Sequence, residues 1–265
     1  MKVGIFIGGQ MREDVETLKI NLELLQTGFD TDNFAFAVWD DDAEAYSDFL
    51  RTLGNVEVFD RFDIDYEPYI ENPKAVLDYQ YQKKLDSPNP RHKHQTKQIL
   101  LHNELMKKYG KNFDVIVRSR WDGTISPAID FLDYIRETVE TPCTMNICTR
   151  DDYHRSIITI GERASWDHSF LHHRSDETEK VYYLECGETK MFLDSGILIH
   201  RSQDWNSELV ERLHNTKKLL AAEFGWWQVL VDGTKHKQWV HYDGGATITR
   251  CVTKSEMKDI KKMLL

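Results

Sequence analysis

Two arginines and an aspartate occupy alternate positions of one short stretch, at Arg118, Arg120 and Asp122. The preceding residues, 113–117, are mostly apolar and β-branched or aromatic, which is typical of a short buried strand. Ligands of open α/β sheets bind beyond the carboxyl ends of the strands, where aspartate can hold a divalent cation and guanidinium groups can pair with phosphate. The stretch therefore indicates a metal and a diphosphate at one strand end. The alternative is an aspartate that caps the next turn and arginines that pair with surface acids.

The first strand is predicted over 3–7, and it ends in a turn that contains two glycines, Gln10 and Arg12. A glycine such as Gly9 lets the backbone turn sharply and lie close to a ligand, although a tight turn between a strand and a helix needs no ligand. Neither a dinucleotide fingerprint nor a P-loop is present. A helix is expected over about 13–28, because apolar residues recur at spacings of three and four.

A second apolar run, 34–39, predicts another buried strand, and it stops at an aspartate triplet that begins with Asp40. One acid of the triplet is expected to cap a helix over 43–53, and Asp40 is placed to reach a ribose or base. A third strand is expected over 55–59. Three strands that alternate with two helices predict a right-handed, mostly parallel sheet.

The segment 60–91 contains four of the six prolines and is too long for an ordinary connection, so we expect an insertion there. A helix over 91–110 follows, and its basic start could meet phosphate or be a solvated helix end. The remaining elements are strands over 142–148, 157–160 and 192–200, helices over 166–173 and around Leu209 to Leu220, and a late strand that ends near His241.

Composition limits the class of protein. A chain of 265 residues with 40% hydrophobic content fits one large α/β domain. A net charge of -10 opposes broad nucleic-acid binding. Four dispersed cysteines indicate free thiols in a reducing compartment, and no apolar run approaches the length of a membrane span. We therefore expect a cytoplasmic protein without a transmembrane segment.

Three short motifs occur in an informative order: Gly9-Gln10-Met11-Arg12, Val38-Trp39-Asp40, and Arg118-Ser119-Arg120-Trp121-Asp122. This series resembles bacterial and viral glycosyltransferases of the GT-A type, which carry "SGQxR", "HTW" and "RxRxD" at these places. The resemblance implies that Asp122 corresponds to the last aspartate of a DxD motif. That aspartate holds Mn²⁺ or Mg²⁺ on the diphosphate of a sugar nucleotide, and Arg120 replaces the first one. Gly9, Gln10 and Asp40 would face the nucleoside, while Arg12, Arg118 and Arg120 would offset the diphosphate charge.

The second half is similar to the glycogenin and bacterial galactosyltransferase group, with "NxGxxL", a "DQ" pair and a late "HYxG". Asp194-Ser195-Gly196 stands for the first, Trp227-Gln228 for the second and His241-Tyr242-Asp243-Gly244 for the third. The resemblance implies that His241 completes the metal shell, although a structural histidine at a strand end would look the same. It also implies that Asp194, Glu223 and Gln228 face the sugar and the acceptor.

Together the resemblances imply one GT-A-like domain over 1–265, a Rossmann-like, mostly parallel sheet flanked by helices. Residues 1–125 would bind the nucleotide and residues 126–265 the sugar and the acceptor. The implied activity is metal-assisted transfer from a nucleotide sugar, most commonly a UDP-sugar, to a glycan or other hydroxyl acceptor. The alternatives are a viral-type enzyme that glycosylates hydroxymethylated DNA pyrimidines, a sugar-nucleotide or glycan-binding module without turnover, and a nucleotidyltransferase.

Overall fold

The structure is a computed structural model that describes most of the first half of the chain and selected elements of the second half. The described residues are 1–11, 13–62, 67–69, 90–125, 130–140, 144–148, 172–173, 181–185, 197–220, 229, 237–241 and 246–248, with side chains over 1–11, 13–62, 96–125, 130–140, 197–217 and at 229. None of the helices within these ranges is both long and apolar enough to cross a membrane.

The amino-terminal part alternates strands and helices as the sequence predicts. The elements are β1 (Val3–Gly8), α1 (Val15–Gly28), β2 (Phe34–Trp39), α2 (Asp40–Arg51) and β3 (Gly54–Phe59). β1 pairs in parallel with β2, and β2 in parallel with β3. After α4 (Pro90–Tyr109) and a short 3-10 turn η2 (Gly110–Asn112), β5 (Val115–Ser119) returns to the other side of β1, again in parallel. The four strands are therefore a parallel block with their carboxyl ends at one edge.

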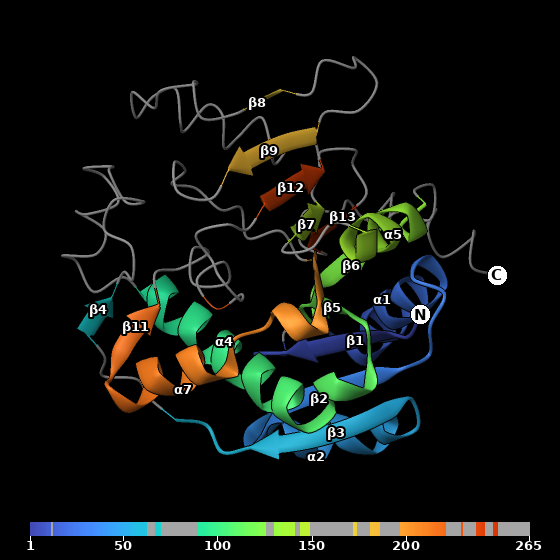
Figure 1. Cartoon of the computed structure of the whole chain (residues 1–265). Helices are drawn as coiled ribbons and strands as arrows, with labels where there is room; N and C mark the ends of the chain where they lie inside the picture. The colour runs from blue at the N-terminus through green and yellow to red at the C-terminus, as the bar shows by residue number, and fades with distance from the viewer. Residues whose placement is uncertain are drawn as a thin grey trace, which may run out of the picture.

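The second half extends this block into a mixed sheet. Its elements are β7 (Thr144–Cys148), β8 (His172–His173), β9 (Val181–Glu185), β10 (Ile197–Arg201) and β12 (Lys237–His241), and the order across the nine-stranded sheet is β3-β2-β1-β5-β10-β7-β12-β9-β8. β10 is antiparallel to both β5 and β7. β12 is parallel to β7 and therefore has the direction of β5. The predicted fold class, an α/β sheet flanked by helices, is confirmed (Figure 1).

Two small sheets lie outside the main one. β4 (Glu67–Tyr69) pairs with β11 (Lys218–Leu220), and β6 (Gly123–Ile125) pairs with β13 (Ala246–Ile248). Leu219 and Leu220 belong to β11, so the predicted extension of the preceding helix is wrong, and α7 (Ser207–Asn215) ends earlier. The predicted helix over 166–173 is also wrong at its end, because 172–173 is strand β8. Most of the predicted insertion at 60–91 lies outside the described residues.

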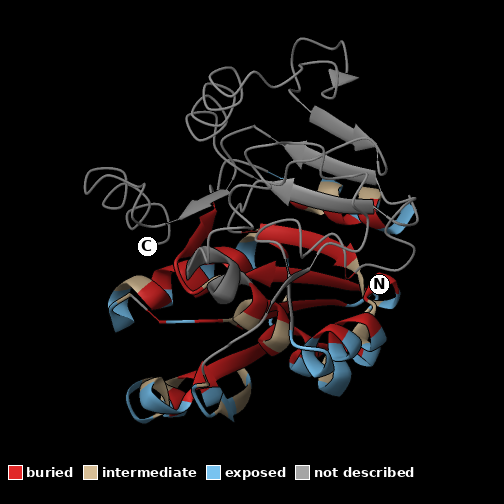
Figure 2. Ribbon diagram, turned by 90° about the vertical axis from the view of Figure 1, so that its left-hand side faces the viewer, coloured by how far each residue is buried: buried red, intermediate tan, exposed pale blue. Residues whose placement is uncertain are grey.

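Side chains alternate across the strands and give the sheet two buried faces. One face carries Ile5, Phe36 and Val117 beneath α1, α2 and α5 (Leu132–Glu140). The other carries Phe6 and Ile116 beneath α4 and α7, two helices that lie side by side (Figure 1). Figure 2 shows the strands buried between these helices, whose outer faces are exposed. A sheet covered on both faces leaves its edges as the places where a ligand can reach the backbone.

The start of α2 differs from the prediction. The helix begins at Asp40 itself, directly after β2, and its N-cap residue Trp39 makes no side-chain cap hydrogen bond. No aspartate of the triplet is therefore the cap. All three acids lie in the first turn instead, where negative charge interacts favourably with the backbone N–H groups and the helix dipole.

Candidate functional site

The parallel direction of β1, β2 and β5 brings three predicted segments to one edge of the sheet. Gly9 and Gln10 follow β1, Asp40 follows β2, and Arg120 and Asp122 follow β5. We call this the donor edge. Arg118 lies within β5 one residue before its end and faces the α4 side of the sheet, as its contact with that helix shows.

The central feature of the donor edge is a fork between Arg120 and Asp122. Nε of Arg120 donates to Oδ1 of Asp122 at 2.7 Å, and Nη2 donates to Oδ2 at 2.9 Å. The two side chains are only 15% and 8% exposed. A tight turn after β5 makes this possible, because the N–H of Gly123 donates to the carbonyl of Arg120 at 3.1 Å. A Cβ at Gly123 would lie 2.6 Å from Oγ of Ser119, so a side chain at this position would displace that hydroxyl.

Arg118 is buried beside the fork, with 2% of its surface exposed. Its Nη2 donates to Oε1 of Gln98, which projects from α4. Gln98 also lies against Gly9, since a Cβ built on that glycine would be 3.4 Å from Cγ of Gln98. Gly9 has φ of +120°, a backbone conformation that residues other than glycine rarely adopt. The glycine turn and the buried arginine are thus joined through one helix residue.

Trp121 ties the loop after β5 to the turn after β1. Its indole Nε1 donates to the carbonyl of Gly9 at 3.0 Å, and its ring stacks on Phe36 with centroids 5.7 Å apart. Nδ2 of Asn21 donates to the carbonyl of Trp121 at 3.4 Å. Because Trp121 separates Arg120 from Asp122 in sequence, anchoring its ring fixes the backbone that carries the fork.

The aspartates that follow β2 gather around Arg61. The backbone N–H of Arg61 donates to Oδ1 of Asp40 at 3.1 Å, and its Nη2 lies 2.8 Å from Asp41 and 3.7 Å from Asp42. Burial raises the pKa of the Asp42 carboxyl, while a hydrogen bond from the backbone of Met11 opposes that rise. The predicted contact of Asp40 with a nucleoside stays a prediction, and its carboxylate already ties the start of α2 to the chain after β3.

The described side chains around Asp122 assemble no divalent-cation site, and the predicted metal site at Asp122 and His241 stays a prediction. Such a site needs several oxygen or nitrogen ligands, and no three His, Cys, Asp or Glu side chains in the described part of the chain gather to hold one. Both oxygens of Asp122 are instead engaged by a guanidinium. The side chain of His241 lies outside the described residues. Its backbone ends β12 at the same edge as β5, three strand positions away, or about 14 Å at ordinary strand spacing.

Four predicted site residues lie outside the described part of the chain: Arg12, Asp194, Glu223 and Gln228. Of the basic residues at the start of α4, only Lys97 has a described side chain. Their assigned roles stay predictions. Two residues of the donor edge were not predicted as site residues, Gln98 and Trp121. Nothing in the sequence distinguishes Gln98 from other polar residues of a helix, whereas a tryptophan between two charged residues at a strand end is a signal that could have identified Trp121.

A buried histidine pair lies on the α4 face of the sheet near Arg118. Nε2 of His102 and Nε2 of His200 are 3.4 Å apart, and Nδ1 of His200 donates to the carbonyl of Arg201 at 2.9 Å. With its proton on Nδ1, His200 accepts through Nε2, so His102 donates. Burial first, and then the electrostatic interactions with His200 and Arg118, hold the pKa of His102 well below its usual range. His102 is therefore neutral and structural.

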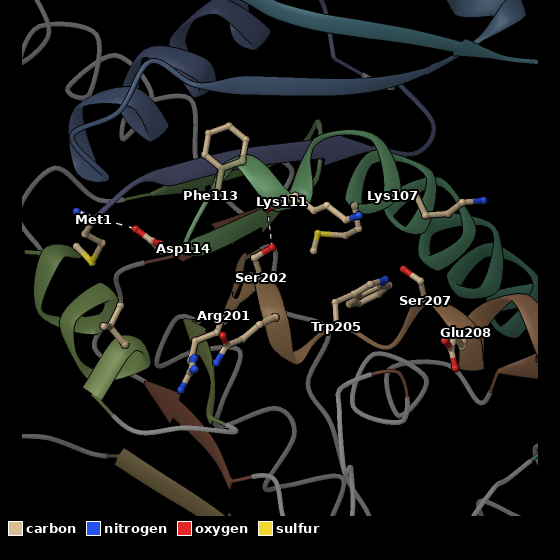
Figure 3. A pocket seen from close by; sticks show the side chains of 14 residues that line it. Met1, Lys107, Lys111, Phe113, Asp114, Arg201, Ser202, Trp205, Ser207 and Glu208 are labelled. Carbon is tan, nitrogen blue, oxygen red and sulfur yellow. Dashed lines mark hydrogen bonds and ion pairs between the residues drawn. The ribbon is translucent and has the colours of Figure 1, made fainter.

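A hollow of about 960 Å³ lies at the opposite edge of the sheet, where β5 begins and β10 ends (Figure 3). Lys111, Asp114, Arg201 and Trp205 are among its described lining residues. Oγ of Ser202, also at this hollow, donates to the carbonyl of Gly110 at 2.6 Å. No predicted site residue is among the described residues that line it, so the hollow is distinct from the donor edge.

No protein-family model matches the chain, and no curated protein matches it either. Among solved structures it is similar to a nucleoside-diphosphate-sugar pyrophosphorylase from Vibrio cholerae, with a TM-score of 0.47 and 11% identity over 98% of this chain and 99% of that one. It is also similar to 4-diphosphocytidyl-2C-methyl-D-erythritol synthase from Anaerococcus prevotii, with a TM-score of 0.45 and 12% identity over 99% and 96% of the chains. A glycosyltransferase involved in the glycosylation of the major capsid of PBCV-1 has a TM-score of 0.41 and 8% identity over 100% of both chains.

Proposed function

We propose that this protein is a glycosyltransferase that uses a nucleotide-sugar donor and binds its diphosphate at the donor edge. The observation that carries the proposal is the meeting of Arg118 and the Arg120–Asp122 fork with the turn at Gly9, where β1 and β5 end. Guanidinium groups pair with phosphate oxygens in a fixed planar geometry. A glycine turn beside them lets the backbone approach the same ligand.

The chemistry of transfer gives these groups a defined task. The bond between C1 of the sugar and the diphosphate oxygen breaks, and its electron pair stays on that oxygen. The acceptor oxygen forms the new bond to C1 and gives its proton to a base, for which Asp194 and Glu223 are the proposed candidates. If configuration is retained, Gln228 is the proposed group beside C1. Positive charge from Arg118 and Arg120 would stabilise the diphosphate as its negative charge grows.

The proposed acceptor is a glycan or another hydroxyl compound. A net charge of -10 opposes a DNA acceptor, because each neutralised phosphate contributes to binding through counterion release. A hydroxymethylated DNA base remains the alternative acceptor, since the basic start of α4 contains Arg91 and Lys93. Charge reversal at these two residues should abolish labelling of DNA and leave labelling of a glycan unchanged.

Incubation of the protein with a panel of nucleotide sugars tests the proposal, with mass spectrometry of the products in the presence and absence of a cell-envelope glycan extract and hydroxymethylcytosine DNA. We expect a free nucleoside diphosphate together with a free or transferred sugar. The Arg118→Met variant should turn over about 10- to 100-fold more slowly, in line with the loss of one charged hydrogen bond. Arg136→Met, which removes an exposed arginine of α5, is the matched control.

Other products would replace the proposal with one of its rivals. Pyrophosphate released from a nucleoside triphosphate and a sugar phosphate would identify a nucleotidyltransferase. Saturable binding of a nucleotide sugar without any product would identify a binding module. A donor panel that is neither bound nor consumed would contradict the proposal as a whole.

A further inference from the structure

We infer that Arg120 takes the place of a divalent cation at the donor diphosphate, so that the donor binds without a metal ion. This inference rests on the proposed function and concerns the same edge of the sheet. It changes the role of Asp122 from metal ligand to positioning residue, a carboxylate that aims a guanidinium at the ligand.

The first support is that the carboxylate of Asp122 already pairs with a positively charged side chain. One guanidinium donates to both of its oxygens, at 2.7 and 2.9 Å, within a pair that is largely buried. A metal ion bound to Asp122 would have to displace the two N–H groups of Arg120 from carboxylate oxygens that are largely buried. Breaking one partner away from a buried ion pair is strongly unfavourable, so the fork opposes entry of a metal.

The second support is that the other acids described at this edge also face an arginine. Asp41 and Asp42 lie within ion-pair distance of the side chain of Arg61, and Asp40 accepts from its backbone N–H. These carboxylates therefore already have hydrogen-bond or ion-pair partners, and the guanidinium of Arg61 offsets one of their three negative charges. Among the described residues, no group of three potential ligands is assembled.

The third support is the geometry of the guanidinium itself. It has five N–H groups in one plane, and the fork to Asp122 engages the side formed by Nε and Nη2. The plane therefore directs the N–H groups of Nη1 away from the carboxylate. The fork to Asp122 therefore holds a planar, permanently charged guanidinium in a fixed orientation at the end of β5. A positive charge held in a fixed place is what a bound cation would supply to a diphosphate.

Isothermal titration calorimetry with UDP, GDP, ADP and dTDP as probes tests the inference, once in EDTA and once in Mn²⁺. For the nucleotide that binds, we expect dissociation constants that agree within about twofold in the two conditions. Arg120→Met should weaken binding about 10-fold or more in both, because the oriented charge is lost. Arg136→Met, on α5, should bind like the wild type in both conditions.

The sharpest variant is Arg120→Asp, which places carboxylates at positions 120 and 122. It should bind the nucleotide weakly in EDTA and regain affinity in Mn²⁺, because the two acids can then share a cation. Electron paramagnetic resonance of Mn²⁺ should detect protein-bound ion in this variant with the nucleotide that binds, and no protein-bound ion in the wild type with the same nucleotide. Arg120→Lys, which keeps the charge and loses the fork, should bind in EDTA with an intermediate affinity.

Each remaining outcome has one meaning. Wild-type binding that appears only in Mn²⁺, with a matching resonance signal, would overturn the inference and leave the proposed function standing. Equal affinity of Arg120→Met and wild type would overturn the role of Arg120. If Arg120→Met does not fold, the wild-type comparison and the resonance signal still decide. A failure of all four nucleotides to bind in either condition would contradict the proposed function instead.

Discussion

At the scale of single residues, the contact between Trp121 and Gly9 holds the donor edge together. The indole N–H satisfies a backbone carbonyl in a turn whose glycine adopts φ of +120°. The same ring is buried against Phe36 of β2. One side chain therefore fixes the relative position of the turn after β1, the end of β2 and the loop that carries Arg120 and Asp122.

The Trp121→Phe variant tests whether this side chain supports nucleotide binding in addition to the stability of the fold. Loss of the hydrogen bond to a buried carbonyl should lower the free energy of unfolding by about 1–3 kcal/mol, as measured by urea denaturation. Nucleotide binding should weaken as well, because the turn at Gly9 loses its hydrogen bond to the indole. Trp205→Phe is the matched control, since this indole donates to Oδ1 of Asn103 at 2.9 Å and lines the opposite hollow. A similar loss of stability with unchanged binding is expected there, and equal weakening of binding in both variants would contradict the role of Trp121.

Sequence reasoning found the residue types of the donor edge and missed how they pair. The alternate spacing of Arg118, Arg120 and Asp122 predicted a charged strand end, and the structure places all three there. The fork between Arg120 and Asp122 was not predicted, because it depends on the tight turn that Gly123 closes. Likewise, the contact of Arg118 with Gln98 joins residues 20 positions apart, and a pattern in one strand contains no information about the helix that covers it.

At the scale of elements, α1 shows how a local signal sets a helix that supports the site. Oδ1 of Asp14 accepts from the backbone N–H of Thr17 at 2.9 Å, and Oδ2 accepts from its hydroxyl. The hydrogen bond from the Thr17 backbone, followed by that from its hydroxyl, lowers the pKa of Asp14 below 3.8. The helix begins immediately afterwards and places Asn21 under Trp121.

Asp14→Ala should lower the free energy of unfolding by about 1 kcal/mol at neutral pH, because one N-terminal N–H loses its acceptor. The folded-state pKa is depressed, so the cap is fully effective above the ordinary value of 3.8 and is lost as pH falls through the folded pKa. The difference between wild type and variant should therefore shrink in acid. Asp14→Ser caps without titrating, and its stability relative to Asp14→Ala should stay constant with pH when both are measured by thermal denaturation.

Prediction of the elements succeeded where the signal was local. The strands β1, β2 and β5 were each predicted because apolar, β-branched or aromatic runs of five or six residues end at polar or glycine-containing turns. The order of the sheet beyond β5 could not be predicted. β10 enters between β5 and β7 as an antiparallel strand, which depends on pairing between residues about 80 positions apart, such as Leu198 with Arg118.

At the scale of the whole molecule, the sheet and the helix layer of α4 and α7 enclose a pair of histidines. His102 of α4 and His200 of β10 are 4% and 2% exposed, and Trp205 packs against both rings. The pair connects the helix that supports Arg118 to the strand that extends the sheet. Protonation of His102 would place a second positive charge near Arg118 without solvent to screen it.

The stability of the whole chain should therefore depend on pH through His102. Its pKa in the fold is depressed below the ordinary 6.5, so the unfolded chain binds a proton that the folded chain excludes. This contribution is fully present above pH 6.5 and falls by at most about 1.4 kcal/mol per pH unit as the solution is acidified. Urea denaturation at several pH values should show a shallower dependence in His102→Gln than in wild type. Exposed His214→Gln is the control and should keep the wild-type slope.

The tryptophans of the donor edge also give it an optical property. Trp121 is buried with its indole N–H on Gly9, and Trp39 closes β2 beneath Arg61. Indole emission responds to nearby charge and to stacking by a nucleobase, so a ligand at this edge would be reported by the protein itself, without a label. The chain has 7 tryptophans, and the spectrum of Trp121→Phe subtracted from that of the wild type isolates the reporter at the glycine turn. The residue that fixes the site thus also makes its occupation visible.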